Sequence, residues 1–332
     1  MSVKLEIRDR LLKILENYGR DGVSQGELVE ESGYSKSWVS EVLKELESRG
    51  LVARVPGPGK TKRVVLSKYL DPSVGKTIRI GLVRASEYLY LPNLFSHLRS
   101  FGYEVELVLY GNVSEATAAL ARAEVHLSIS PIYTQAVYRA LGAPIKAFHG
   151  GALGGASLIY RHLGGKVLSS RASTMEIAAI ALHKATGYEI PELHYYKTPE
   201  EGVQVFIQGG ADAIAIWEPY ASELEGRGYK RVRLIEHIGD YYCCTLAKHE
   251  NLSNEVSKHV EKSWEKALIE ARAGNISRDS LLIIGIEKAI VEKAIGEYKY
   301  TEELEWDYIK KTLSYTAGFL LNQATVRELL ED

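Results

Sequence analysis

The first seventy residues carry apolar side chains at helical spacing, followed by two short runs that suit strands. A helix is predicted over residues 5–18, where leucines recur every three to four positions. Ser24 and Ser35 are each placed to cap a following helix. The runs 51–55 and 62–66 flank a proline- and glycine-rich turn, which predicts a β-hairpin. Three helices followed by a hairpin predict a winged helix, a variant of the helix-turn-helix unit.

From about residue 77 the pattern changes to apolar runs of strand length that alternate with helical segments. Strands are predicted at 78–83, 104–109, 125–130, 145–148, 166–169, 192–197, 211–216 and 231–235. Helices are predicted near 91–101, 114–122, 132–141, 173–186, 199–208 and 219–226, and throughout the chain beyond residue 252. This alternation predicts an α/β domain, here with two lobes around a cleft.

These patterns divide the 332 residues into three parts: a winged helix at 1–70, a turn-rich linker at 71–77 and the two-lobed domain at 78–332, with its second lobe at about 166–235. Hydrophobic residues make up 45% of the chain, enough for buried cores, so a disordered chain is excluded. No run approaches the roughly 18 apolar residues that span a bilayer. The first twenty residues lack the apolar core of a secretory signal, so we expect a cytoplasmic protein.

Positive charge is concentrated in the N-terminal part. Residues 1–70 carry thirteen Lys and Arg against ten Asp and Glu, whereas the remainder carries 28 against 33. Five cations and no acid lie between Arg54 and Lys68, along the predicted hairpin. Such an asymmetry favours a nucleic-acid-binding segment, although a solvated charged face is the commoner cause of a charge run.

The segment 35–52 resembles the recognition helix and first wing strand of MarR-like winged-helix regulators, and the resemblance covers about 65 residues. It implies binding of double-stranded DNA. The residues that it places in the major groove are Ser35, Lys36, Ser37, Trp38 and Ser40, and those that it places at phosphates or the minor groove are Arg54, Lys60, Lys62 and Arg63. Two alternatives stay open: the winged helix serves protein contacts, or Trp38 packs beneath the wing.

The run 209–220, with its Trp217-Glu218-Pro219-Tyr220 end, resembles a stretch of type II periplasmic-binding-protein folds, in the branch that binds nitrate, sulfonates and thiamine pyrimidines. Residues 165–174 and 125–131 resemble the same branch, and the resemblance covers roughly residues 78–325. It implies a two-lobed domain with a ligand cleft. LysR-type regulators combine similar parts, but they carry a long linker helix where this chain has a proline- and glycine-containing connector.

Ligands of open α/β folds bind at the carboxyl ends of strands. Candidate ligand-binding residues are therefore Ser86, Tyr88, Ser130, Tyr133, His149, Gly150, Ser170, Arg171, Ser173, Thr174, Trp217, Glu218 and Tyr242. The helix start at 170–174 suits an anion, unless Ser173 is only a helix cap and Arg171 points to solvent. Glu218 suits a cationic group, so we expect a small-molecule effector that is anionic, zwitterionic or pyrimidine-like.

The same branch contains a eukaryotic thiamine-pyrimidine synthase, which this chain resembles around residues 233–246. That resemblance implies a dense run of cysteines for iron, but only Cys243 and Cys244 are present, and Tyr133 stands where the enzyme has a histidine. We therefore expect no catalytic residues, no metal, no cofactor and two buried structural cysteines.

The function expected from the sequence is a cytoplasmic, ligand-responsive transcriptional regulator that acts as a homodimer. The alternatives are a cytoplasmic solute-binding protein whose winged helix serves protein contacts, and a synthase-like enzyme.

Overall fold

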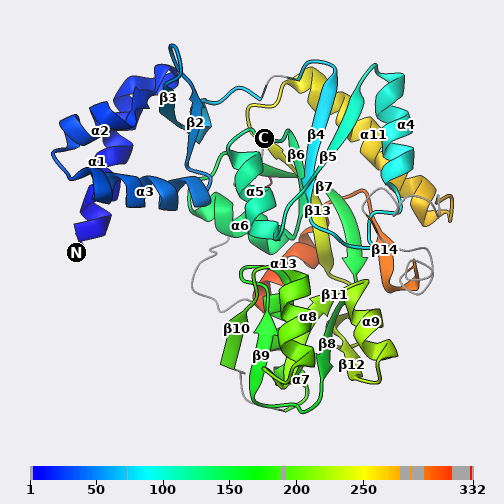
Figure 1. Ribbon diagram of the computed structural model, residues 1–332. Helices are drawn as coiled ribbons and strands as arrows, with labels where there is room; N and C mark the ends of the chain where they lie inside the picture. The colour runs from blue at the N-terminus through cyan, green and yellow to red at the C-terminus, as the bar shows by residue number, and fades with distance from the viewer. Residues whose placement is uncertain are drawn as a thin grey trace.

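The computed structural model describes residues 3–72, 74–187, 192–276, 285, 295–315 and 330. Three separate sheets divide this part of the chain into an N-terminal head, residues 3–70, and two lobes (Figure 1). Lobe 1 comprises residues 77–154, 241–276 and 295–315, and lobe 2 comprises residues 156–187 and 192–238. None of the described helices is long and apolar enough to cross a membrane.

The head is a three-helix unit with a small sheet of order β1-β3-β2. Its elements are α1 (Val3–Tyr18), η1 (Gly19–Asp21), β1 (Val23–Ser24), α2 (Gln25–Ser32), α3 (Lys36–Ser48), β2 (Val52–Pro56), β3 (Lys62–Leu66) and η2 (Ser67–Tyr69). Ser24 and Glu27 form a capping box at the start of α2, and the Ser35 side chain caps α3. The predicted helices and hairpin are confirmed.

Lobe 1 is built on a six-stranded sheet of order β14-β7-β13-β6-β4-β5. Its strands are β4 (Thr77–Leu82), β5 (Glu104–Leu109), β6 (Leu127–Ser130), β7 (Ile145–Gly154), β13 (Tyr242–His249) and β14 (Tyr298–Tyr300). Its helices are α4 (Leu91–Ser100), α5 (Val113–Ala121), α6 (Ile132–Ala140), α11 (Asn254–Arg272) and α13 (Trp306–Ser314), with the short helix η4 (Ile295–Glu297). Strands β4, β5 and β6 are parallel, whereas β13 runs antiparallel to both of its neighbours.

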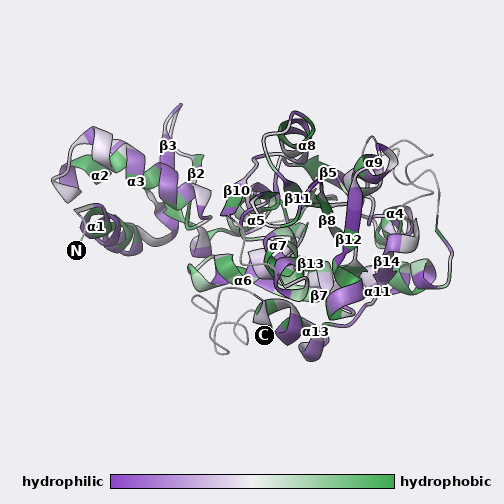
Figure 2. Ribbon diagram, turned by 90° about the horizontal axis from the view of Figure 1, so that it is seen from below, coloured by the Kyte–Doolittle hydropathy of each residue, from purple (hydrophilic) through white to green (hydrophobic). Residues whose placement is uncertain are grey.

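Lobe 2 is built on a five-stranded sheet of order β10-β9-β11-β8-β12. Its strands are β8 (Ala156–Tyr160), β9 (Lys166–Ser169), β10 (Glu192–Tyr195), β11 (Ala213–Trp217) and β12 (Lys230–Arg233). Its helices are α7 (Thr174–Ala185), α8 (Pro199–Ile207), α9 (Tyr220–Gly226) and α10 (Leu234–Ile238). The inner strands β8 and β11 are mainly hydrophobic, whereas the edge strand β12 is mainly hydrophilic (Figure 2). The mixed α/β class predicted from the alternation is confirmed.

Three strands of the two lobes, β8, β13 and β14, were not predicted from the sequence, and neither was the two-residue strand β1 of the head. Strand β13 is buried at every position, so it lacks the polar–apolar alternation by which a half-buried strand is recognised. The expectation that only helices follow residue 252 is wrong at β14, which adds a three-residue edge to lobe 1. Most of 277–294 and 316–332, also predicted to be helical, lies outside the described residues.

The head is docked on lobe 1 through the C-terminal end of α3. The Arg122 guanidinium donates to the Glu47 carbonyl at 2.7 Å, and the Tyr138 hydroxyl donates to the Ser48 carbonyl at 3.0 Å. Gly50, with φ +69°, follows α3 so closely against α5 that an added Cβ would lie 2.5 Å from the Ala121 Cβ. Helix α3 is therefore anchored at its C-terminal end by α5 and α6.

Candidate functional site

The two lobes are in contact across the cleft. The Trp217 indole N–H of lobe 2 donates to the Arg84 carbonyl of lobe 1 at 2.9 Å. The Thr174 hydroxyl donates to the Cys243 carbonyl at 3.0 Å, so the start of α7 is tied to β13. The two lobes are closed in the sense that hydrogen bonds join them directly.

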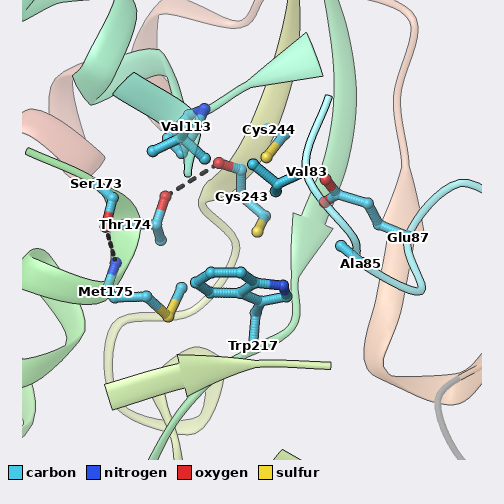
Figure 3. A pocket seen from close by; sticks show the side chains of 11 residues that line it. Val83, Ala85, Glu87, Val113, Ser173, Thr174, Met175, Trp217, Cys243 and Cys244 are labelled. Atoms are coloured by element: carbon cyan, nitrogen blue, oxygen red, sulfur yellow. Dashed lines mark hydrogen bonds between the residues drawn. The ribbon is translucent and has the colours of Figure 1, made fainter. Parts of the chain in front are cut away.

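A cavity of about 20 Å³ remains between the closed lobes, and side chains from both lobes surround it (Figure 3). It is lined by Val83, Ala85, Glu87, Val113, Pro131, Ser173, Thr174, Met175, Trp217, Cys243 and Cys244. A volume of this size holds about one water molecule or one ion. Two larger hollows are lined by lobe 1: one of ≈ 480 Å³, and one of ≈ 240 Å³ to which Leu330 also contributes. Of these three spaces, the small cavity is the one lined by residues of both lobes.

The acidic residue that lines this cavity is Glu87, which is 1% exposed. It lies in the loop after β4, and neither of its carboxylate oxygens has a hydrogen bond of acceptable geometry among the described residues. Burial raises its pKa to about 7, although the nearby thiols of Cys244 and Cys243 and the Tyr88 hydroxyl lower it in part. The cavity therefore contains a carboxyl group that is only partly ionised at neutral pH.

Cys243 and Cys244 are both directed to this cavity because β13 is irregular there. Between Tyr242 and Cys244, β13 advances two residues while its partner β7 advances only from Leu153 to Ala152. In a regular strand adjacent side chains point to opposite faces, and a bulge of one extra residue removes that constraint. Each cysteine is 4% exposed, so the expectation of buried cysteines is confirmed.

Both thiols are held in their protonated form. Burial raises the pKa of Cys244 well above its ordinary value. The neighbouring Cys244 thiol lowers the pKa of Cys243, but burial and the Glu87 carboxyl outweigh this effect and raise it.

Of the candidate ligand residues, Ser173, Thr174 and Trp217 line the cavity. The Ser173 hydroxyl caps α7 and donates to the Ser170 carbonyl, and the Thr174 hydroxyl bonds to β13, so both hydroxyls are used by the fold. Arg171 is exposed and lies over the Tyr195 ring at 4.5 Å. The alternative in which Ser173 is only a helix cap therefore fits the geometry better than a ready anion site.

Other candidates lie beside the cavity without lining it. Ser86 and Tyr88 flank Glu87, and Ser130 precedes Pro131 and interacts with Gln135. The side chain of Tyr133 is in the first turn of α6, where burial raises its pKa to about 12.

Four further candidates are used elsewhere. Glu218 is fully buried and ion-paired with Arg231, so its charge is already compensated within lobe 2. His149 lies in the ≈ 240 Å³ hollow beside α11, and Gly150 accepts the Trp264 indole N–H. Tyr242 donates to the Glu303 carbonyl, away from the cavity.

Sequence patterns missed Glu87, although they placed its neighbours Ser86 and Tyr88 at the cleft. A signal was available: the loop after the first strand of an α/β fold contributes to ligand sites, and Glu87 is its only acid between 83 and 90.

The predicted DNA surface divides into exposed and anchored residues. Lys36, Ser37 and Trp38 at the start of α3 are exposed, with Trp38 42% exposed, so it does not pack beneath the wing. Ser35 is the cap of α3, and Ser40 is half-buried.

On the wing, Lys60 and Lys62 are exposed, whereas the two arginines bind within the head. Arg54 is paired with Glu47 at 2.8 Å, and the Arg63 guanidinium donates to the carbonyls of Asp21 and Gly22. These two arginines hold the wing against the helices, and the two lysines remain as its free cations among the described residues.

Comparison with known proteins agrees with this division of the chain. Residues 10–63 match the MarR family. None of the curated proteins matches the chain in sequence.

The remainder has the fold of periplasmic solute-binding proteins. The ligand-binding component of an ABC-type import system from Staphylococcus aureus, solved with zinc bound, is 16% identical with a TM-score of 0.65, over 78% of this chain and 100% of that one. The alkanesulfonate-binding protein from Xanthomonas axonopodis pv. citri, bound to MOPS, is 17% identical with a TM-score of 0.59, over 78% of this chain and 99% of that one. At these identities the likeness shows the fold alone.

Proposed function

We propose that the protein is a transcriptional regulator whose head binds DNA. Its two lobes close on a small ligand, a molecule or ion referred to as the guest, in the cavity between them. The match of residues 10–63 to the MarR family supports DNA binding, and the solute-binding fold of the remainder supports ligand binding. The observation that carries the proposal is the placement of α5 and α6, which connect the cavity to the head.

Each of these two helices begins at the cavity and ends at the recognition helix. Helix α5 starts with Val113, which lines the cavity, and ends at Ala121 against Gly50. Helix α6 follows the cavity residue Pro131 and carries Tyr138, which bonds to the end of α3. A change in the lobes at the cavity therefore has a direct packed route to the DNA-reading element.

The closed cavity limits the guest that fits without a change of shape. About 20 Å³ accommodates one water or one ion, so a sulfonate or a pyrimidine binds only if the lobes close less tightly than in this structure. Open and closed lobes are then the two states whose balance the guest shifts.

The same proposal includes a homodimer in the cytoplasm that does not catalyse a reaction. A single head contacts too few base pairs for useful specificity, and two half-sites one helical turn apart need two heads. The cavity thiols support a binding role, since a catalytic thiol needs a lowered pKa and theirs are raised.

The test is the reciprocal coupling of guest and DNA. Fluorescence anisotropy with the duplex upstream of the protein's own coding sequence and a scrambled duplex, at low salt, measures DNA affinity with and without each guest. Thiamine precursors, sulfonates and nitrate are the guests screened. We expect one class to change DNA affinity by roughly 5- to 150-fold, and DNA to change its affinity by the same factor. Absence of binding to both duplexes at low salt would contradict the proposal.

A further inference from the structure

Three metal-ligand side chains meet in the cavity between the lobes: Glu87, Cys243 and Cys244. One carboxylate oxygen and the two Sγ atoms all lie within 4.8 Å of one another. Figure 3 shows the Glu87 side chain pointing toward the two cysteines, which come from the second chain segment of lobe 1, on β13. All three residues are at least 96% buried.

The Glu87 carboxyl group has no hydrogen-bond partner among the described protein groups. A buried carboxyl group without a hydrogen bond is costly, and both oxygens of Glu87 lack one of acceptable geometry. The bulge in β13 brings a second thiol to the same point, at the expense of regular strand pairing. The cavity beside them, of about 20 Å³, has room for about one ion or one water molecule.

We propose that Glu87, Cys243 and Cys244 bind one thiophilic divalent cation of the zinc class, with the fourth coordination position open to the cavity. Two sulfurs and one carboxylate oxygen suit Zn²⁺, whereas Mg²⁺ and Ca²⁺ require mainly oxygen ligands. Three atoms no more than 4.8 Å apart share a point within about 2.8 Å of each. Shifts of up to about 0.5–0.8 Å per ligand atom therefore reach zinc–ligand distances of ~2.0–2.3 Å.

Binding is an exchange of protons for the cation, without oxidation or reduction. Cysteine ligates as the thiolate, so the cation replaces the protons of the two thiols. The bound ion then supplies the positive charge that the buried carboxylate lacks.

Cation binding is measured on the full-length protein alone, so it is independent of the proposed function. The protein is kept reduced with a phosphine, stripped with a chelator and titrated with Cd²⁺ as a spectroscopic probe, and Zn²⁺ then competes. We expect one Cd²⁺ per chain, an ultraviolet thiolate-to-cadmium absorption, release of about two protons at pH 7 and a higher melting temperature. Mg²⁺ should produce none of these changes.

Variants locate the site. Cys243→Ser and Cys244→Ser should each weaken Cd²⁺ binding about 100-fold and reduce the absorption, and Glu87→Gln should keep the absorption while weakening binding about tenfold. The matched control is Glu261→Gln in the second cluster of possible ligands, His149, Glu261 and Glu265, and it should bind as the wild type does.

The proposal is overturned if wild-type protein shows no thiolate absorption with Cd²⁺, if the double cysteine variant still binds it, or if Glu261→Gln abolishes binding instead. Glu87→Gln keeps the test valid where a serine variant fails to fold. Cation binding that leaves DNA affinity unchanged would support the site and show that the cation is not the effector.

Discussion

Glu87 is the residue where burial and charge conflict most clearly in the described chain. Its pKa of about 7 lies above the ordinary value of 4.5, so the folded protein binds a proton there over a pH range in which the unfolded chain does not. The contribution of Glu87 to the free energy of unfolding is therefore fully present below about pH 4.5, and it is lost as the pH rises through about 7.

In metal-free protein we expect Glu87→Gln to remove this pH dependence. Between pH 4.5 and 8 the wild type should lose about 3 kcal/mol of unfolding free energy through Glu87, a loss that the variant lacks. Denaturant unfolding at several pH values with chelator present measures it. Glu106→Gln, on the exposed edge strand β5, is the control and should behave as the wild type does. Equal pH profiles for the wild type and Glu87→Gln would contradict the expectation.

Single residues were the scale at which the sequence predicted least. It placed Ser173, Thr174 and Trp217 at the cavity, because strand ends and helix starts follow from local pattern. It did not place Glu87 there, since a glutamate in a loop is ordinarily exposed and this one is buried only by the packing around it. The pairing of Cys243 with Cys244 at one point depends on a bulge, which no periodicity encodes.

At the scale of elements, the junction between α3 and α5 leaves no room for a side chain at Gly50. Glycine is required at position 50 for two reasons: its φ is +69°, and an added Cβ would lie 2.5 Å from the Cβ of Ala121. Gly33, at the end of α2, has φ +75° but open space around it. Comparing substitutions at Gly33 and Gly50 therefore distinguishes the cost of backbone strain from the cost of a clash with lobe 1.

We expect Gly33→Ala to lower the unfolding free energy by about 1 kcal/mol through backbone strain. Gly50→Ala should cost about 1–3 kcal/mol more, because it adds the clash, and it should weaken the effect of a guest on DNA affinity. Adding Ala121→Gly to Gly50→Ala should recover at least about 1 kcal/mol in a double-mutant cycle. Equal costs for the two glycine variants would show that the junction does not bear on stability.

Elements with a clear period were predicted well, and those without one were not. The helices of the head follow from capping serines and apolar spacing, and they formed as expected. Strand β13 was missed because all of its positions are buried, although it is central in lobe 1 and carries both cysteines.

For the whole molecule, the distribution of free cations on the head sets the expected strength of DNA binding. Lys36, Lys60 and Lys62 are exposed, whereas Arg54 and Arg63 are used to hold the wing. The number of phosphate contacts available per head is therefore smaller than the basic run in the sequence suggests.

Replacing Lys60 and Lys62 by Ala should reduce the slope of log affinity against log salt by roughly 3 to 4 for a dimer, at about 0.9 per phosphate and four lysines. The unfolding midpoint should not change. Arg63→Ala should instead lower the midpoint, since it frees the wing from the carbonyls of Asp21 and Gly22. Anisotropy titrations from low to moderate salt measure the slopes, and an unchanged slope would remove the wing lysines from the DNA interface.

Closure of the lobes should be visible in the fluorescence of Trp217, whose indole is 6% exposed and bonded across the cleft to Arg84. A guest that shifts the balance of open and closed lobes should change the emission, and Trp217→Phe should abolish that change while Trp306→Phe keeps it. An emission change that persists in Trp217→Phe would place the response elsewhere.

Because α3 is attached to lobe 1 only at its C-terminal end in the contacts described above, a small rotation there moves its N-terminal end by a larger distance. The thirteen-residue helix is roughly 20 Å long at 1.5 Å per residue, with the attachment point at Ser48 and the opposite end at Lys36. A tilt of only about 5° at the attachment point would move the opposite end by roughly 2 Å. In a pair of heads the two displacements change the span between half-sites, so a rearrangement too small to alter either lobe could decide whether both N-terminal ends enter the groove together.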